Sequence, residues 1–175
     1  LVPYKRIDIA IRAFNEMRVP LKIVGEGPSR SRLERSAGPN IEFLGWVDDA
    51  QLADLYGSCQ ALVFPGEEDF GIVPLEAQAS GRPVIAYAKG GVLETVIPLK
   101  ASAENGGAPS GIFFAQQTPQ HLIEAVELYQ QMQSVFEPSK IREHAAQFSA
   151  QRFREQVHDY VQARLRERWG VTDPC

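Results

Sequence analysis

The sequence has few cysteines, no long apolar run and no excess of positive charge. Its only two cysteines, Cys59 and Cys175, offer neither a disulfide framework nor the spacing of a metal site. We therefore expect a reducing compartment and a buried Cys59. No apolar run approaches the roughly 18 residues that a membrane-spanning helix needs. We expect a cytoplasmic protein with no leader and no membrane span.

The charge balance is acidic, with 18 Lys and Arg against 22 Asp and Glu and a formal net charge of -4. This balance gives no electrostatic reason to expect a nucleic-acid partner. Arginines gather between positions 152 and 168, but acidic residues lie between them. We interpret that segment as a solvated helix face rather than a membrane-binding patch.

What the sequence does have is an ordinary globular composition, with 44% hydrophobic and 23% charged residues. The 175 residues are ample for one domain and short for two, so we expect a single domain over 1–175. Strand-like and helix-like segments alternate along it. Short apolar segments predict strands within 21–28, 41–47, 60–65, 82–88 and 110–115. Apolar periodicity and capping residues predict helices within 5–17, 29–36, 48–56, 73–79, 118–132, 139–148 and 151–169.

This alternation is typical of an α/β protein with a Rossmann-like, doubly wound parallel sheet. The fully apolar strand "QALVFP" fits a sheet buried on both faces. In such sheets, ligands bind beyond the carboxyl ends of the strands. The stretch "EEDFGIVPLEAQASG", Glu67 to Gly81, follows this strand and so lies in that position.

The stretch has the features of an anion cradle. Gly71 permits close backbone approach, and Pro74 suits the first turn of a helix, so we expect the helix to begin near Val73 or Pro74. Its first amides lack partners within the helix and are available to an anion. The glycine richness of a P-loop is absent.

Two carboxylates flank this cradle, Glu68 before the helix and Glu76 in its first turn. A carboxylate accepts hydrogen bonds and repels phosphate, so each requires donors. A ligand with a diphosphate in its middle and hydroxyl groups at both ends satisfies the amides and both carboxylates, and a nucleotide-sugar is such a ligand. The alternative is that Glu76 only favours the helix N-terminus electrostatically and Glu68 is solvated.

The segment "EDFGIVPLEAQASGRPVIA" resembles the E-x7-E motif of retaining glycosyltransferases of family 4 (glycosyl transferases group 1), which have the GT-B fold. "LVPYKRIDIAIRAF", "IVGEGP", "FLGWVDDAQLADLYGSC" and the loop "GGVLETV" are similar to further segments of that family in the same order. The resemblance covers nearly the whole chain. It implies the C-terminal, donor-binding half of a GT-B enzyme, with helices over 139–169 at its end.

The resemblance also implies roles for particular residues. Glu68 would contact the transferred sugar, and Glu76 would hold the ribose diol. Lys5 would neutralise the diphosphate and help it leave. Phe70, Gly71, Ile72 and Leu75 would line the sugar and the phosphates, and Trp46 and Val47 would border the nucleobase. Lys5 is otherwise an exposed first-turn lysine, Trp46 a packing residue and Val47 a strand end.

The family places further parts upstream of the segments that this sequence matches. They are an N-terminal acceptor domain with a catalytic histidine, and the central first strand of the donor domain, which carries an arginine. We expect that Leu1 and Val2 end that strand and that the chain is a fragment, inactive in transfer on its own. His121, His144 and His158 are expected on the surface, away from the cleft.

Other functions have weaker support in the sequence. Acidic residues at Glu67–Asp69 or Asp48–Asp49 could favour a divalent metal, but there is no D-x-D pattern and the family requires no metal or other cofactor. "VGEGPSR" is near a dinucleotide fingerprint but has Arg30 at the third glycine position. A non-catalytic nucleotide-sugar-binding module, or a relative with the same fold such as an epimerase, stays open.

The donor is less well defined than the site. The sequence resembles family members that use GDP-mannose in polysaccharide or lipopolysaccharide assembly. The implied partners are a nucleotide-diphosphate sugar and a saccharide or lipid-linked acceptor. The full-length enzyme would meet a lipid-linked acceptor at the inner membrane face.

Overall fold

The protein was analysed as a computed structural model, which describes residues 1–99 and 108–170. The strands are β1 (Leu21–Val24), β2 (Ile41–Gly45), β3 (Leu62–Phe64), β4 (Val84–Tyr87) and β5 (Gly111–Phe114). The helices are α1 (Ile7–Met17), α2 (Arg30–Ser36), α3 (Asp49–Ser58), α4 (Ile72–Ala79), α5 (Val92–Thr95), α7 (Pro119–Gln131), α8 (Pro138–Ala145) and α9 (Ala150–Trp169). Short 3-10 turns are η1 (Pro3–Lys5), η2 (Gln133–Val135) and η3 (Ala146–Phe148). The expected alternation of strands and helices is confirmed.

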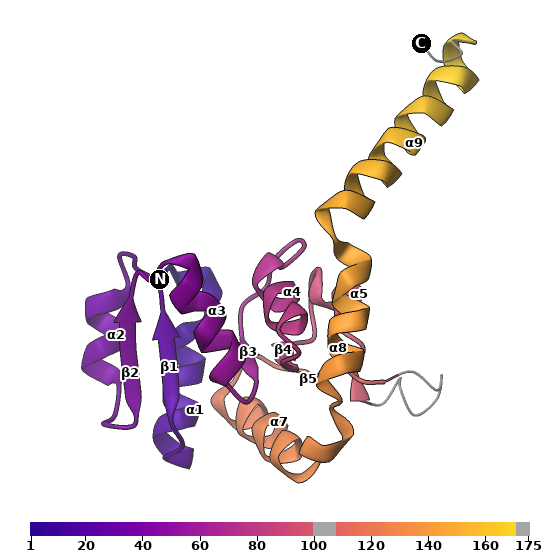
Figure 1. The fold of residues 1–175 in the computed structure, drawn as a ribbon. Coiled ribbons are helices and arrows are strands. Elements are labelled where there is room, and N and C mark those ends of the chain that lie inside the picture. Colours follow the sequence, from indigo (N-terminus) through magenta and orange to yellow (C-terminus); the bar gives the residue numbers. More distant parts are fainter. Residues whose placement is uncertain (100–107, 171–175) are drawn as a thin grey trace.

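All strand pairs in the described residues are parallel, and they form two sheets, β1-β2 and β3-β4-β5 (Figure 1). Leu62 of β3 pairs with Val84 of β4, and Val84 pairs with Gly111 of β5. Parallel strands need crossover connections, which the helices between them supply. The predicted Rossmann-like α/β class is therefore confirmed.

Strand β4 is buried on both faces, as its continuous apolar sequence indicates. Ile85 points into a core shared with α1 and α7, which pack against each other. Val84 and Ala86 point into a second core with Tyr56 of α3 and with residues of α4 and α5. The two cores place α1 and α7 on one face of the β3-β4-β5 sheet and α3, α4 and α5 on the other.

Two predicted helix starts have the expected caps. The carboxylate of Asp48 accepts a hydrogen bond from the Gln51 amide at 2.8 Å, and the Gln51 side chain accepts one from the Asp48 amide, which makes a complete capping box on α3. Thr118 caps α7, with Pro119 at its first position. Local sequence therefore determines where these helices begin.

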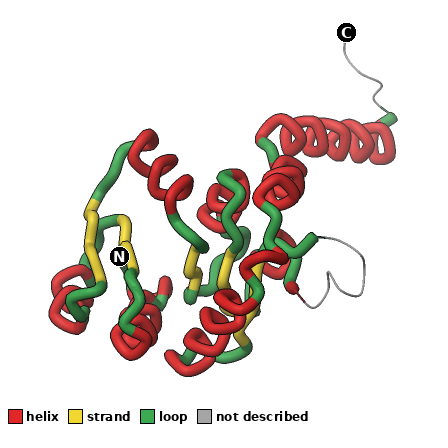
Figure 2. The backbone as a smooth tube through the Cα atoms, turned by 60° about the horizontal axis from the view of Figure 1, so that its bottom comes forward, coloured by secondary structure: helices red, strands yellow, loops and turns green. Residues whose placement is uncertain are grey.

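The sheet is interrupted between β1 and β3 (Figure 2). Each of these strands has one hydrogen-bonded neighbour in the described part of the chain, β2 for β1 and β4 for β3. The carbonyl of Leu1 accepts from the Ser29 amide at 3.0 Å, beside the carboxyl end of β1. That a strand from an upstream segment pairs here stays a prediction.

The C-terminal helices differ in packing. Helix α8 packs against α4, whereas α9 has no buried residue and projects from the rest of the chain (Figure 1). No helix within 1–99 or 108–170 combines the length and apolar character needed to cross a bilayer.

Two local predictions were wrong. The segment expected as the loop "GGVLETV" contains α5, because Val92 and Val96 are buried in the second core and the chain coils between them. Cys59 was expected to be buried but is only half-buried, since it lies at the C-terminal end of α3. Partial burial raises the pKa of its thiol above the usual value.

Candidate donor-binding site

The loop after β3 carries the site. Pro65 and Gly66 are buried where the strand ends, and the chain then emerges to solvent at Glu67. Gly71 adopts the left-handed conformation (φ 81°) and directs the chain into α4, which begins at Ile72, slightly earlier than predicted. Pro74 occupies its first turn, as expected.

The N-terminus of α4 has no side-chain cap. The amides of Phe70, Gly71 and Ile72 donate to no group in the described part of the chain. Unpaired amides at a helix N-terminus carry partial positive charge and suit an anion. The predicted cradle is therefore present in geometry.

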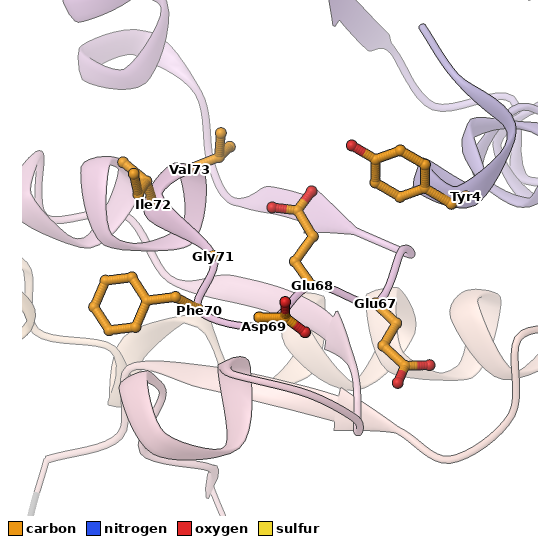
Figure 3. A pocket seen from close by; sticks show the side chains of 8 residues that line it. All are labelled: Tyr4, Glu67, Glu68, Asp69, Phe70, Gly71, Ile72 and Val73. Atoms are coloured by element: carbon orange, nitrogen blue, oxygen red, sulfur yellow. The ribbon is translucent and has the colours of Figure 1, made fainter.

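An open pocket of about 530 Å³ lies over this loop (Figure 3). Its lining residues are Tyr4, Glu67, Glu68, Asp69, Phe70, Gly71, Ile72 and Val73. Four predicted donor-site residues, Glu68, Phe70, Gly71 and Ile72, are therefore brought together. Tyr4 lies across the opening from Glu68, and the Phe70 ring extends from the far side of the loop (Figure 3).

Lys5 and Glu68 form an ion pair through Lys5 Nζ and Glu68 Oε1. Lys5 Nζ also lies 5.5 Å from the centre of the Tyr4 ring. A Cβ on Gly66 would approach Lys5 Cα to 2.9 Å, so glycine permits η1 to pack closely against the loop. Partial burial lowers the pKa of the Lys5 ammonium below its usual value.

Glu76 lies beyond the first turn of α4, contrary to expectation, because the helix begins at Ile72 rather than near Val73 or Pro74. It is oriented by a residue that was not predicted from the sequence. The Tyr56 hydroxyl, from α3, donates a hydrogen bond to Glu76 Oε2 at 3.0 Å. Burial, and secondly the charge on Glu76, raise the pKa of Tyr56 well above its usual value. A charge-assisted hydrogen bond of this kind fixes one carboxylate oxygen and leaves the other to accept from a ligand.

The remaining predicted residues are more dispersed. Leu75 is half-buried on α4, next to Glu76. Trp46 and Val47 lie between β2 and α3, outside the lining of the pocket. Trp46 is 77% exposed, so the packing alternative for its side chain is excluded. Their contact with a nucleobase stays a prediction.

The acidic residues near the pocket do not converge. Glu67 forms an ion pair with Lys89 at 3.1 Å and points away from Glu68 (Figure 3). Among residues 1–99 and 108–170, no group of three or more metal-binding side chains lies together. Metal independence stays a prediction.

The expectation for the histidines was wrong in two cases. His158 is exposed, but His121 and His144 are half-buried. His121 Nδ1 lies 2.7 Å from Thr118 Oγ1, and His144 Nε2 lies 3.0 Å from the carbonyl oxygen of Thr95. Both side chains are partly covered because α7 and α8 pack against other elements of the chain. Helix periodicity alone does not predict which elements these are.

The sequence matches the family described as "Glycosyl transferases group 1" over residues 1–152. The chain belongs to this family. Similar proteins include a GDP-mannose-dependent alpha-mannosyltransferase of Mycobacterium tuberculosis, 40% identical over 56% of this chain and 26% of the relative. The alpha-1,3/1,6-mannosyltransferase ALG2 of Mus musculus is 32% identical over 89% of this chain and 34% of the relative. The chain thus spans about a third of the length of such curated relatives, or less.

Solved structures share the fold. A complex of HepE from Anabaena with UDP and glucose superposes with a TM-score of 0.74, at 22% identity, over 92% of this chain and 45% of that one. Sucrose-phosphate synthase from Thermosynechococcus elongatus gives a TM-score of 0.77, at 24% identity, over 93% of this chain and 43% of that one. At these identities the likeness establishes the Rossmann-like, GT-B-type architecture.

Proposed function

We propose that the pocket over the loop and α4 binds the nucleotide-sugar donor of a retaining glycosyltransferase. The observation that carries this proposal is the arrangement around α4. Unpaired amides at its N-terminus are flanked by Glu68 on the pocket side and by Glu76 further along the helix, where Tyr56 holds it. This arrangement matches a ligand with a central diphosphate and hydroxyl groups at both ends.

Each group has a role in the proposal. Glu76 accepts hydrogen bonds from the ribose diol, and Glu68 accepts them from the transferred sugar. The backbone of Phe70, Gly71 and Ile72 binds the diphosphate and borders the sugar. The larger part of the enzyme, which the relatives' lengths imply, would bring the acceptor to this pocket.

Lys5 links the two halves of the site. Its ion pair with Glu68 neutralises both groups while no donor is bound. A diphosphate competes for the ammonium, which leaves the Glu68 oxygens to accept from sugar hydroxyls. As the sugar–phosphate bond breaks, negative charge grows on the diphosphate, and Lys5 and the α4 amides stabilise it. Positioning and charge stabilisation account for most of the catalytic effect expected of this half.

We propose GDP-mannose as the donor, with a saccharide or lipid-linked acceptor. The support is that several similar curated proteins are named as GDP-mannose-dependent mannosyltransferases. HepE, a structural neighbour, was solved with UDP and glucose, so UDP-glucose is the comparison ligand.

Calorimetric titration tests the proposal. The 175-residue chain is titrated with GDP, UDP and ADP, then with GDP-mannose and UDP-glucose, without and with Mg²⁺. We expect selective binding of GDP that mannose tightens and that Mg²⁺ does not alter. Equal, weak binding of all nucleotides would contradict the proposed donor, and absence of any binding would contradict the site in this chain. Tight binding of GDP-mannose by a longer protein that transfers nothing would favour a non-catalytic module.

A further inference from the structure

A chain of contacts joins the donor loop to the C-terminal helices. It begins at the carbonyl of Glu68, which accepts from the Gly91 amide at 2.8 Å. The Gly91 carbonyl accepts from the Thr95 hydroxyl at 3.2 Å, and Thr95 is fully buried. The imidazole of His144 then donates through Nε2 to the Thr95 carbonyl at 3.0 Å, which assigns the proton to Nε2 because a carbonyl only accepts.

Aromatic rings return the chain of contacts to the loop. The His144 ring meets the Phe148 ring edge to face, with centres 5.5 Å apart. Phe148 in turn meets Phe70 edge to face, with centres 6.4 Å apart. Phe70 lines the pocket and is half-exposed, and its contact with Phe148 restrains the ring on one side. Edge-to-face pairs are favourable beyond the area that they bury.

The contacts leave the loop little room on the side of α5. A Cβ on Gly91 would come within 2.4 Å of both the Asp69 carbonyl oxygen and Phe70 Cα. The turn that begins α5 therefore lies directly against the backbone of the loop. Helix α8, which carries His144, is itself packed on α4. The loop and α4, which supply all of the pocket lining except Tyr4, thus both contact the segment that contains α8 and Phe148.

We infer that His144 and Phe148 are positioning residues that hold Phe70 and the loop Glu68–Gly71 in the conformation that receives the sugar end of the donor. His144 fixes α5, whose first turn binds the Glu68 carbonyl, and Phe148 fixes the Phe70 ring. Neither residue lines the pocket. The inference rests on the proposed function only for its effect on the donor, because the effect on the loop is independent of any ligand.

The first test uses no ligand. Backbone order parameters of Glu68–Gly71 and hydrogen exchange of the Gly91 amide are measured by NMR in the wild-type chain and in Phe148→Leu, His144→Ala and His144→Gln. We expect Phe148→Leu to lower the order parameters and His144→Ala to accelerate exchange of Gly91. His144→Gln should restore slow exchange, because its amide nitrogen can donate to Thr95 in place of Nε2. Gln147→Ala, an exposed neighbour in the same turn, is the control.

The second test measures dissociation constants for GDP-mannose and for free GDP. Phe148→Leu should weaken binding of the sugar conjugate by about threefold to tenfold, the range of one aromatic pair, with a smaller effect on GDP. A variant that only destabilised the fold would lower the unfolding temperature and leave the ratio of the two constants unchanged.

The outcomes are distinct. Unaltered loop order and Gly91 exchange in both Phe148→Leu and His144→Ala would overturn the inference, whatever the chain binds. An altered loop in a chain whose wild type binds no nucleotide-sugar would support the positioning role and contradict the proposed function. An altered loop with an unchanged ratio of constants in a wild type that does bind would refute the part that concerns the sugar.

Discussion

The hydrogen bond between Tyr56 and Glu76 is the contact on which the proposed nucleotide recognition depends most. The Tyr56 hydroxyl is held in the second core with its oxygen directed at Glu76 Oε2. Its ring belongs to the hydrophobic packing and its hydroxyl to the site, which is a common use of buried tyrosine. A single residue therefore couples the stability of the fold to the orientation of the carboxylate that we propose binds ribose.

Substitution Tyr56→Phe should weaken GDP binding while leaving the fold intact. The ring and its packing stay, but Glu76 loses the donor that selects its rotamer, so we expect a dissociation constant about threefold to tenfold higher. Calorimetry with GDP measures the effect, and circular dichroism confirms the fold. Tyr129→Phe removes another half-buried hydroxyl, bound to the Gln60 carbonyl, and serves as the control. Equal affinity in wild type and Tyr56→Phe would show that the hydrogen bond does not orient Glu76.

The same tyrosine should shape the alkaline stability of the protein. Burial raises its pKa in the folded state, so above about pH 10 the unfolded chain loses this proton more readily than the folded chain. The free energy of unfolding should therefore decrease as the pH rises above about 10. We expect wild type to lose more free energy of unfolding between pH 8 and pH 11 than Tyr56→Phe does. Urea denaturation at both pH values measures this difference, and parallel losses in the two proteins would contradict it.

At the scale of elements, α3 has a cap at its start and carries the tyrosine that contacts Glu76. Its capping box at Asp48 fixes where the helix starts, and its last turns carry Tyr56. Helix α4 is arranged differently, because its N-terminus has no side-chain cap and remains open to the pocket. The start of α3 is thus capped by its own side chains. The start of α4 has no such cap, so its backbone amides are open to a ligand.

Replacement of the cap should cost stability at α3. Asp48→Ala removes the acceptor for the Gln51 amide, and we expect a loss of about 1 kcal/mol in the free energy of unfolding. Asp49→Ala, at the next position, removes the same charge without removing the cap and should cost less. Urea denaturation of both variants makes the comparison. Equal losses would mean that charge rather than capping stabilises the start of α3.

The sequence predicted these elements unequally, for physical reasons. Caps and apolar strands are local signals, so the starts of α3 and α7 and the class of the sheet were predicted correctly. The first turn of α5 depends on Val92 being buried against distant residues, and local pattern did not show it. Likewise, the motif identified Glu68 and Glu76, but only the folded chain reveals that Tyr56 and Lys5 contact them.

At the scale of the whole molecule, the interruption between β1 and β3 is the main departure from a continuous sheet. The amide of Leu62 donates to the Pro83 carbonyl at 3.0 Å. Because alternate residues of a parallel strand face opposite neighbours, the amide of Val63 faces the interruption. The partly buried Val63 side chain still packs on the core beneath it.

Hydrogen exchange should register this interruption. In the 175-residue chain we expect the Val63 amide to exchange at least about tenfold faster than those of Leu62 and Phe64, because opening is not required to expose it. NMR exchange rates measure the three amides in one experiment. Equal protection of all three would mean that Val63 has a hydrogen-bond partner in solution, contrary to the sheet described above.

In the proposed site, Glu76 binds the ribose of the donor and Glu68 binds its transferred sugar. Variants at these two positions test this assignment most directly. Dissociation constants for GDP and GDP-mannose are measured by calorimetry for Glu76→Ala and Glu68→Ala. Glu76→Ala should weaken the binding of both ligands, by about 1.5–3 kcal/mol of binding free energy, because both contain ribose. Glu68→Ala should leave GDP binding undiminished and weaken only GDP-mannose. If both variants weaken GDP and GDP-mannose to the same extent, the proposed division is wrong.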